Sequence, residues 1–160
     1  MLQKRVAEAA LDSEEQGLAE VEFGLVYSAF GQLERAIDCY RRAAGLWGEH
    51  PELALEIAKL LVEIGQPMPA IAFLHQALAD DKTRTAAHLL LARIDTARGL
   101  LEQARQHLEL ASEVAPAWGQ LLDMLAFVHQ HLGNTEQAQA LRERSEQQRR
   151  QGDLLAGQLR

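Results

Sequence analysis

The chain has 160 residues, of which 48% are apolar and 24% are charged, and its formal charge at neutral pH is −7. This much apolar material can form a buried core, which excludes a disordered chain, and the acidic charge disfavours a general nucleic-acid binder. No apolar run approaches the roughly 20 residues of a membrane span, and the N-terminus shows no secretory signal. We therefore expect no nucleic acid as partner, no membrane insertion and a cytoplasmic location.

The residue usage favours helices throughout. Alanine and leucine together make up a third of the chain, whereas valine, isoleucine and threonine are far less frequent. Unbranched and small side chains lose little freedom in a helix, while β-branched ones favour strands, so the composition predicts an all-α protein. The single Cys39 excludes a disulfide framework and a thiolate zinc site.

A 34-residue interval, such as that from Gly31 to Gly65, runs along the whole chain. It separates the glycines Gly31, Gly65, Gly99 and Gly133, and it also separates the alanines Ala36, Ala70, Ala104 and Ala138. Each unit of this length holds two apolar-periodic segments of about 14 residues, divided by the glycine. Small residues allow two helices to approach closely, and glycine supplies the open backbone that ends the first of them. The pattern predicts repeated helix pairs.

In chain order, we predict a first helix over 2–15 and then four helix pairs: 17–30 with 33–47, 51–64 with 67–80, 85–98 with 101–114, and 119–132 with 135–150. Segment 2–15 is expected to pack on helix 17–30 as the second helix of an incomplete repeat, because stacked repeats bury their faces only against neighbours. Gly152 is expected to break the chain. A short helix over 153–160 would then dock Leu155 and Leu159 against helix 135–150.

The period and its residues resemble the tetratricopeptide repeat (TPR) family. The first unit matches best, with Gly24, Tyr27, Ala36, Tyr40 and Ala43 at the family's small and aromatic positions. The resemblance implies an all-α, right-handed α-solenoid of four helix-turn-helix units at 17–50, 51–84, 85–118 and 119–152. Residues 1–16 would form a partial repeat, and residues 153–160 the start of a fifth repeat or a cap. The apolar ends favour a fragment of a longer TPR protein over native caps.

The sequence offers no catalytic or metal-binding motif. It lacks a glycine-rich phosphate loop, a serine elbow and a histidine–carboxylate zinc motif. His129 and His131 are two residues apart on a predicted helix, so they cannot ligate one ion together. Asp95 and His129 share a seam position of adjacent units and need hydrogen bonds there, either with each other or separately. We expect His107 on or near the outer surface, and no enzyme activity, cofactor or metal.

The TPR resemblance implies that the first helices line a concave groove that binds an extended peptide or a partner helix. The residues expected to line it are Val21, Leu25, Ser28, Leu55, Lys59, Val62, Glu63, Leu89, Arg93, Thr96, Asp123, Phe127, Gln130 and His131. Val21, Leu25, Leu55 and Leu89 would form an apolar strip for the ligand's side chains. Lys59 and Arg93 would form a cationic pair for an acidic group or a C-terminal carboxylate.

These features predict a non-catalytic scaffold for protein–protein interaction whose partner is a peptide or helix of another protein. The residues that clamp chaperone-tail carboxylates in one subclass of the family do not occur at the matching places, which disfavours such tails. Three alternatives stay open. The chain could be a small TPR chaperone for secreted or assembly-competent clients, the helical arm of a larger multidomain enzyme, or a module that associates with itself.

Overall fold

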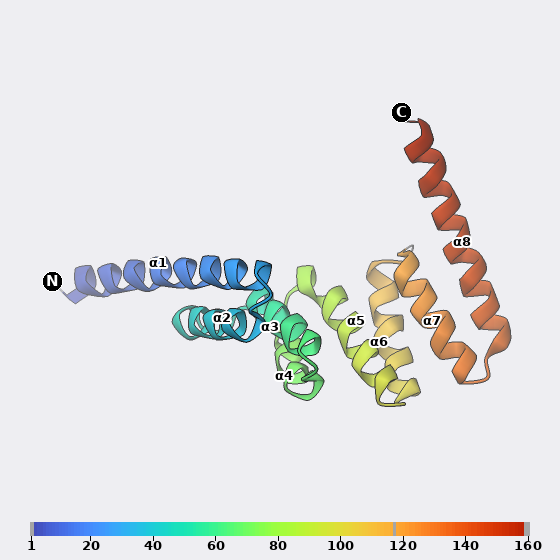
Figure 1. The fold of residues 1–160 in the computed structure, drawn as a ribbon, viewed down its shortest axis with the longest axis horizontal. Coiled ribbons are helices and arrows are strands. Elements are labelled where there is room, and N and C mark those ends of the chain that lie inside the picture. Colours follow the sequence, from blue (N-terminus) through green and yellow to red (C-terminus); the bar gives the residue numbers. More distant parts are fainter. Residues whose placement is uncertain (1, 117, 159–160) are drawn as a thin grey trace. The chain divides into compact units, whose positions relative to one another are not determined.

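The computed structural model describes the backbone of residues 2–116 and 118–158, and the side chains of residues 12–116, 118–152 and 154. Within these residues the chain forms eight helices and no strand (Figure 1). The helices are α1 (Leu2–Ala29), α2 (Leu33–Trp47), α3 (Pro51–Glu63), α4 (Pro67–Ala77), α5 (Asp81–Ala97), α6 (Leu101–Val114), α7 (Gly119–His131) and α8 (Thr135–Gln158). The expected all-α class is confirmed. No described helix is both long and apolar enough to cross a membrane.

The two helices of each repeat are joined by a glycine in the left-handed region. The φ angles of these glycines, Gly31, Gly65, Gly99 and Gly133, lie between 71° and 83°. The residue after each glycine donates its N–H back into the first helix, as Gln32 does to the carbonyl oxygen of Tyr27 at 2.8 Å. This bond and the positive φ together form a Schellman ending, which satisfies a helix-end carbonyl and turns the chain. The regular glycine interval therefore marks the same backbone turn four times.

The helices pack in chain order within two compact units, Met1–Thr83 and Arg84–Arg160. In the first unit, α1 packs on α2, α2 on α3 and α3 on α4, and in the second unit α6 packs on α7 and α7 on α8. The alanines of the repeat are fully buried, as expected of close helix contacts: Ala36, Ala43, Ala70, Ala77, Ala104, Ala111 and Ala138. The second unit has a core in which Leu108 of α6 meets Leu121 and Leu125 of α7.

The N-terminal segment does not form the separate helix that was expected over 2–15. Helix α1 runs without interruption from Leu2 to Ala29 (Figure 1), so the segment cannot fold back onto residues 17–30. Gly17, the first residue of the first predicted unit, lies inside this helix. A glycine within a helix costs only about 1 kcal/mol relative to alanine, which does not suffice to break it. The expectation that residues 2–15 cover helix 17–30 is wrong.

The expectation for the C-terminal segment also needs a correction, because the predicted break at Gly152 does not occur. Helix α8 continues through Gly152 to Gln158, so residues 153–158 do not turn back against helix 135–150. Leu154, which neighbours the predicted docking residue Leu155 in the sequence, is 68% exposed. The side chain of Leu155 and the whole of Leu159 lie outside the described residues. The expected docking of a short terminal helix is therefore wrong for the part of the chain that is described.

One helix boundary moves because of a local cap. Helix α4 ends at Ala77 and α5 begins at Asp81, whereas the sequence pattern placed these limits at 80 and 85. The Lys82 N–H donates to the Asp80 carboxylate at 3.2 Å, and the Thr83 hydroxyl donates to the Ala77 carbonyl oxygen at 2.5 Å. An aspartate at this position satisfies a free N–H of the first turn, so α5 begins one turn earlier.

Candidate functional site

In the first unit, a pocket of about 620 Å³ opens beside the predicted apolar strip. Its lining includes three of the predicted groove residues, Val21 and Leu25 of α1 and Leu55 of α3. Leu25 is 58% exposed, while Leu55 is only 6% exposed. The second helix α2 adds Tyr40 and Trp47 to the wall. The sequence analysis missed these two because it considered first-helix positions only.

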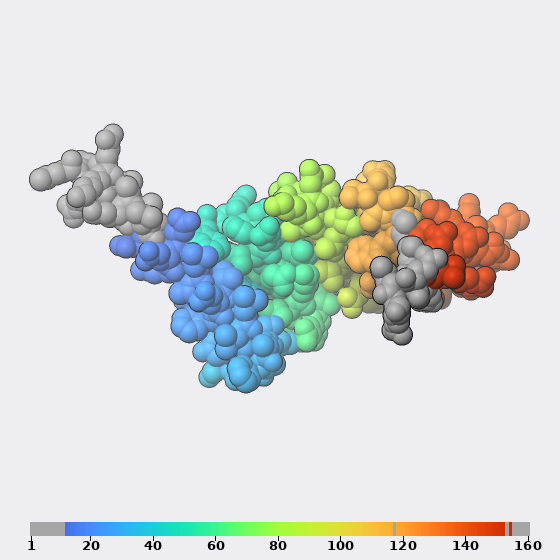
Figure 2. All heavy atoms as spheres, turned by 90° about the horizontal axis from the view of Figure 1, so that it is seen from above, coloured from blue at the N-terminus to red at the C-terminus, as the bar shows by residue number. Residues whose placement is uncertain are grey.

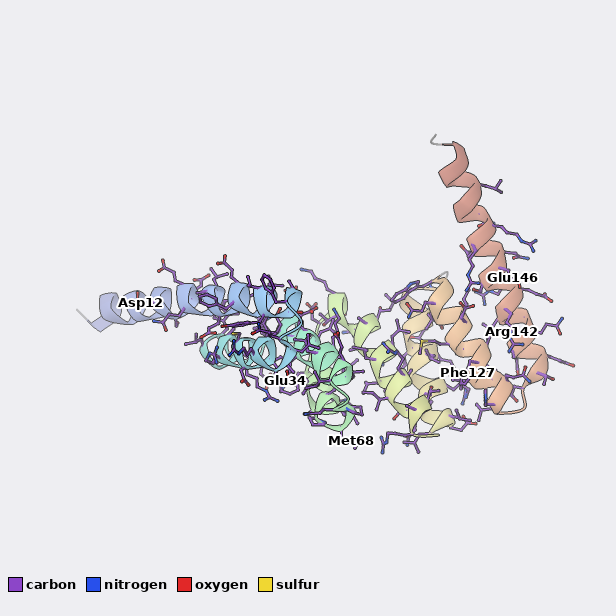
Figure 3. The ribbon with its side chains drawn as sticks, viewed as in Figure 1. Asp12, Glu34, Met68, Phe127, Arg142 and Glu146 are labelled. Atoms are coloured by element: carbon purple, nitrogen blue, oxygen red, sulfur yellow. The ribbon has the colours of Figure 1, made fainter. Side chains whose placement is uncertain are left out.

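In the second unit, a pocket of about 420 Å³ lies between successive first helices. It brings together four predicted residues, Arg93 and Thr96 of α5 with Asp123 and Phe127 of α7. Phe127 is 47% exposed, and Figure 3 shows it on α7. The remaining wall, which the sequence analysis missed, consists of Ala97, Gln120 and Met124. We number unit positions from the first residue of each repeat, so Gln120 is at unit position 2 of the fourth repeat. The family uses this position in its groove, so the sequence could have predicted Gln120.

The charges of this second pocket are unequal. Asp123 forms an ion pair with Arg149 of α8 and accepts a hydrogen bond from the Ser145 hydroxyl at 2.7 Å. Arg149 and the Ser145 hydroxyl therefore largely compensate the negative charge of Asp123. Arg93 is exposed, and within the described residues no ion pair holds its guanidinium. The pocket thus combines an apolar wall with one cation that can take a further partner.

Lys59, the other predicted cation, is already paired. Its Nζ lies 2.6 Å from the Glu56 carboxylate, one turn earlier on α3. Lys59 belongs to the first compact unit and Arg93 to the second, so their joint action stays a prediction. Since the exposed pair with Glu56 is weak, Lys59 can exchange partners at little cost. Of the two, Arg93 is the cation better prepared for a ligand.

The other predicted groove residues differ in accessibility. Leu89 is 6% exposed and packs in the core with Leu108 and Leu121, so it offers a ligand almost no surface. Those that remain accessible are half-buried (Ser28 and Val62) or exposed (Glu63, Gln130 and His131). The His131 ring lies 4.1 Å from the ring of Phe127, centroid to centroid. His131 thereby extends the aromatic surface beside the second pocket.

A buried polar cluster lies elsewhere in the second unit. The Nδ1 atoms of His88 and His107 are 3.0 Å apart, and His107 Nε2 lies 3.8 Å from the Asp95 carboxylate. Burial, together with the nearby His107 and Arg84, lowers the pKa of His88 below its ordinary value. His107 is half-buried, with a side chain that is 24% exposed, so it lies near the surface while its ring contacts His88, and His75, expected at the same kind of position, is exposed. Asp95 and His129 are satisfied separately, because His129 bonds with Asn134 at 3.3 Å.

The described residues show no arrangement of three or more histidine, cysteine or acidic side chains that could hold a metal ion. Cys39 is buried, and its burial and its hydrogen bond with Glu20 raise the pKa of the thiol. A raised pKa suppresses the thiolate, which is the reactive form. Cys39 therefore has the environment of a packing residue.

Comparison with known proteins gives one consistent family. Models of the tetratricopeptide repeat match residues 21–46 and 69–126. No curated protein matches the sequence. The fold is similar to a solved structure of MamA, at 15% identity and a TM-score of 0.79, covering 93% of this chain and 88% of that chain.

Two further solved structures bear on binding. YrrB, described as a TPR protein with an unusual peptide-binding site, is 18% identical with a TM-score of 0.72, covering 92% of this chain and 81% of that chain. The first TPR of Spaghetti (RPAP3), bound to the HSP90 peptide SRMEEVD, is 23% identical with a TM-score of 0.68, covering 75% of this chain and 95% of that chain. At these identities the likeness shows the fold.

Proposed function

Because the chain belongs to the tetratricopeptide repeat family, we propose that it is a scaffold that binds a peptide or helical segment of another protein on its first helices. Repeats of this family generally act as non-catalytic interaction modules. Two similar folds have a peptide site or a bound peptide according to their descriptions. The chemistry of the ligand proposed below is argued from this chain's own side chains.

The observation that carries the proposal is the second pocket. The exposed aromatic ring of Phe127 lines this pocket together with Met124 and the cation of Arg93. Pockets that bind ligands combine an apolar wall with a few polar groups that fix orientation. Asp123 does not neutralise the charge of Arg93, because the Asp123 carboxylate already pairs with Arg149. The ligand is therefore a segment with an apolar side chain next to an acidic group or a C-terminal carboxylate.

The first pocket supplies a second point of contact that is mainly apolar, although His50, Glu52, Glu56 and Thr83 also line it. Leu25 and Val21 present aliphatic surface next to Tyr40, and leaving such surface in water is unfavourable by about 25 cal/mol per Å².

The test selects random 12-residue peptides on the intact chain and measures the winners by fluorescence anisotropy. We expect enrichment of peptides that pair an apolar residue with a carboxylate. Arg93→Glu and Phe127→Ala should each weaken the selected peptide about tenfold or more, since a lost charge-assisted bond or aromatic anchor is worth about 1.5–3 kcal/mol. Arg150→Glu is the matched control, because it makes the same charge reversal at an exposed side chain that lines neither pocket. Equal binding by Arg93→Glu and Phe127→Ala would overturn the proposal.

A further inference from the structure

A second apolar surface lies on a different face of α1. Ala19, Phe23, Val26 and Phe30 recur at intervals of four, three and four residues, so they share one side of the helix. All four are exposed: Phe23 by 58%, Val26 by 52% and Phe30 by 77%. We name these four residues the α1 stripe. None of them belongs to the predicted groove.

In later repeats the same unit positions are buried by the second helix that precedes them. The counterparts of Ala19, Phe23 and Val26 in repeat four are Leu121, Leu125 and Val128 of α7, which are at most 5% exposed. They pack against Ala104, Leu108 and Ala111 of α6. The counterparts in repeat two, on α3, are Leu53, Ile57 and Leu60, at most 6% exposed, and α3 packs on α2. The α1 stripe therefore corresponds to the surface on which the preceding second helix packs in repeats two and four, but no described helix packs on it.

The described residues supply no cover for this stripe. The segment expected to cover it, residues 2–15, continues α1 in a straight course instead (Figure 1). Figure 2 shows one side of the described part of α1, in blue, and the exposed fractions of Phe23, Val26 and Phe30 show that the stripe itself is accessible. An apolar stripe that includes two exposed phenylalanines is unfavourable in water and marks an interaction site.

A pocket of about 500 Å³ borders the stripe where α1 meets α2. Its α1 wall consists of Gln16, Ala19, Glu20 and Phe23, and its α2 wall consists of Arg42, Gly45 and Leu46. A Cβ at Gly45 would meet nothing within 4 Å. A glycine in the middle of a helix costs about 1 kcal/mol relative to alanine, and it permits another backbone to approach closely. The pocket therefore has the shape that a further helix requires.

The charges around the stripe select the kind of helix. Between Asp12 and Phe30 the sequence has the acidic residues Asp12, Glu14, Glu15, Glu20 and Glu22 and no lysine or arginine. Glu20 is neutralised by Arg42, which donates to both of its carboxylate oxygens at 2.7 and 2.9 Å. Glu15 and Glu22 lie exposed along one flank of the stripe, and the exposed Asp12 continues the line of the stripe toward the N-terminus,. Their carboxylates favour lysine and arginine on the occupant.

The same charges disfavour a second copy of this chain. Two α1 stripes placed face to face would bring their acidic flanks together, and like charges across an interface cost several kcal/mol. Helix α8 of another copy is also unsuited. Where α2 and α6 bury Tyr40 and Leu108, α8 has the exposed Arg142. The occupant is therefore not a second copy of this chain.

We propose that the α1 stripe binds an amphipathic helix of a partner protein, with apolar residues at i, i+3 or i+4, and i+7 flanked by lysine or arginine. This helix takes the place that the second helix of a preceding repeat would have. From Ala19 to Phe30 the stripe is about 17 Å long at the helical rise, which matches a partner helix of about 12–15 residues. The site is separate from the groove, so the chain can hold two segments at once.

The test uses two synthetic peptides and the intact chain. The first peptide is the sequence of α6, Leu101–Val114, with Glu102→Lys, Glu109→Lys and Glu113→Lys; the second is the unchanged α6 sequence. Helix α6 is chosen because its Leu108 and Ala111 pack on this same face in repeat four. We expect the lysine peptide to bind at least about tenfold more tightly by anisotropy, and its advantage to shrink as salt rises.

The matched variants separate the stripe from any other apolar surface. Phe30→Glu should weaken the lysine peptide about tenfold, and Phe23→Glu with Phe30→Glu should weaken it further. Met68→Glu, at a side chain of α4 that is 57% exposed (Figure 3), should leave binding unchanged. Circular dichroism checks that each variant is folded, and Phe30→Glu, at the most exposed position, keeps the test valid if the double variant unfolds.

Three results would overturn the proposal: no binding of the lysine peptide at millimolar concentration, equal binding of the unchanged peptide, or full binding by Phe30→Glu. Sedimentation of the wild-type chain adds a fourth. A dimer that Phe30→Glu dissociates would identify a second copy as the occupant and would also overturn it. The groove peptide should bind Phe30→Glu normally, so failure here is distinguishable from failure of the proposed function.

Discussion

Helices α1 and α7 occupy the same place in their repeats, yet their corresponding faces have opposite environments. At unit position 7, Phe23 of α1 is 58% exposed, whereas Leu125 of α7 is 5% exposed. Both side chains are large and apolar, so the difference lies outside the two helices. Helix α6 covers Leu125, and no described helix covers Phe23. In a repeat protein, burial at a given position is set by the neighbouring repeat rather than by the residue itself.

Unit position 1 gives a second contrast, because glycine stands there in both repeats. A Cβ added to Gly17 of α1 would overlap the indole ring of Trp47, whereas at Gly119 of α7 the nearest atom is the Ser145 hydroxyl oxygen at 3.8 Å. Trp47 occupies unit position 31, where repeat four has Arg149. The first repeat therefore needs a glycine at this position so that Trp47 can pack closely. The fourth repeat could accommodate a Cβ at the same position.

The largest expected effect tests burial at position 7 directly. Leu125→Ala should lower the free energy of unfolding by about 3 kcal/mol, since it removes buried methyl groups and leaves a cavity. Phe23→Ala should change it by less than about 1 kcal/mol, because most of the ring is already in water. Urea denaturation of the intact chain, followed by circular dichroism, measures both. Similar losses would mean that a helix covers α1 in solution.

The next effect concerns position 1. Gly17→Ala gains about 1 kcal/mol of helix propensity but forces the Trp47 ring to move, at a cost of about 1–3 kcal/mol. We expect a net loss of stability of about 1 kcal/mol. Gly119→Ala, with only an ordinary contact nearby, should be neutral or slightly stabilising. Tryptophan fluorescence provides a second measurement, because a displaced Trp47 should shift its emission in Gly17→Ala alone. Unchanged stability and emission there would contradict the close packing.

The smallest effect extends the contrast to position 4, where repeat one has Glu20, repeat three His88 and repeat four Leu122. The pKa of His88 is lowered in the folded chain, so below the ordinary histidine pKa the unfolded chain takes up protons that the folded chain refuses,. Stability from the neutral ring is complete above about pH 6.5 and is lost as the pH falls toward the folded value.

The urea midpoint should therefore fall between pH 7.5 and pH 5.5, and His88→Gln should reduce that fall. The neighbours of His88 that titrate or carry charge, namely His107, Asp95 and Arg84, remain in the variant. Measuring the variant and the wild-type chain at both pH values isolates the contribution of His88. The same fall in the two proteins would show that another group is responsible.

The sequence anticipated parts of the candidate site and missed others for a definite reason. Val21, Leu25 and Leu55 lie in one pocket, and Arg93, Thr96, Asp123 and Phe127 lie in another, as their shared unit positions indicate. Leu89 has the same unit position as Leu55 and is equally buried, at 6% exposed, but it lines neither pocket. The ion pair of Asp123 with Arg149 joins residues 26 apart in sequence. No repeat position predicts such a pair, because it depends on side chains that vary between units.

By itself, the sequence determined the helices and the turns between them. Helix formation and the glycine-ended turn depend on interactions within a few residues, so the regular period specifies them locally. The glycine pattern misplaced two helix boundaries, because Gly17 and Gly152 lie inside α1 and α8 and a single glycine costs a helix only about 1 kcal/mol,. Only the tertiary structure decided that the α1 stripe lies uncovered, because burial requires a neighbour that the local sequence cannot supply.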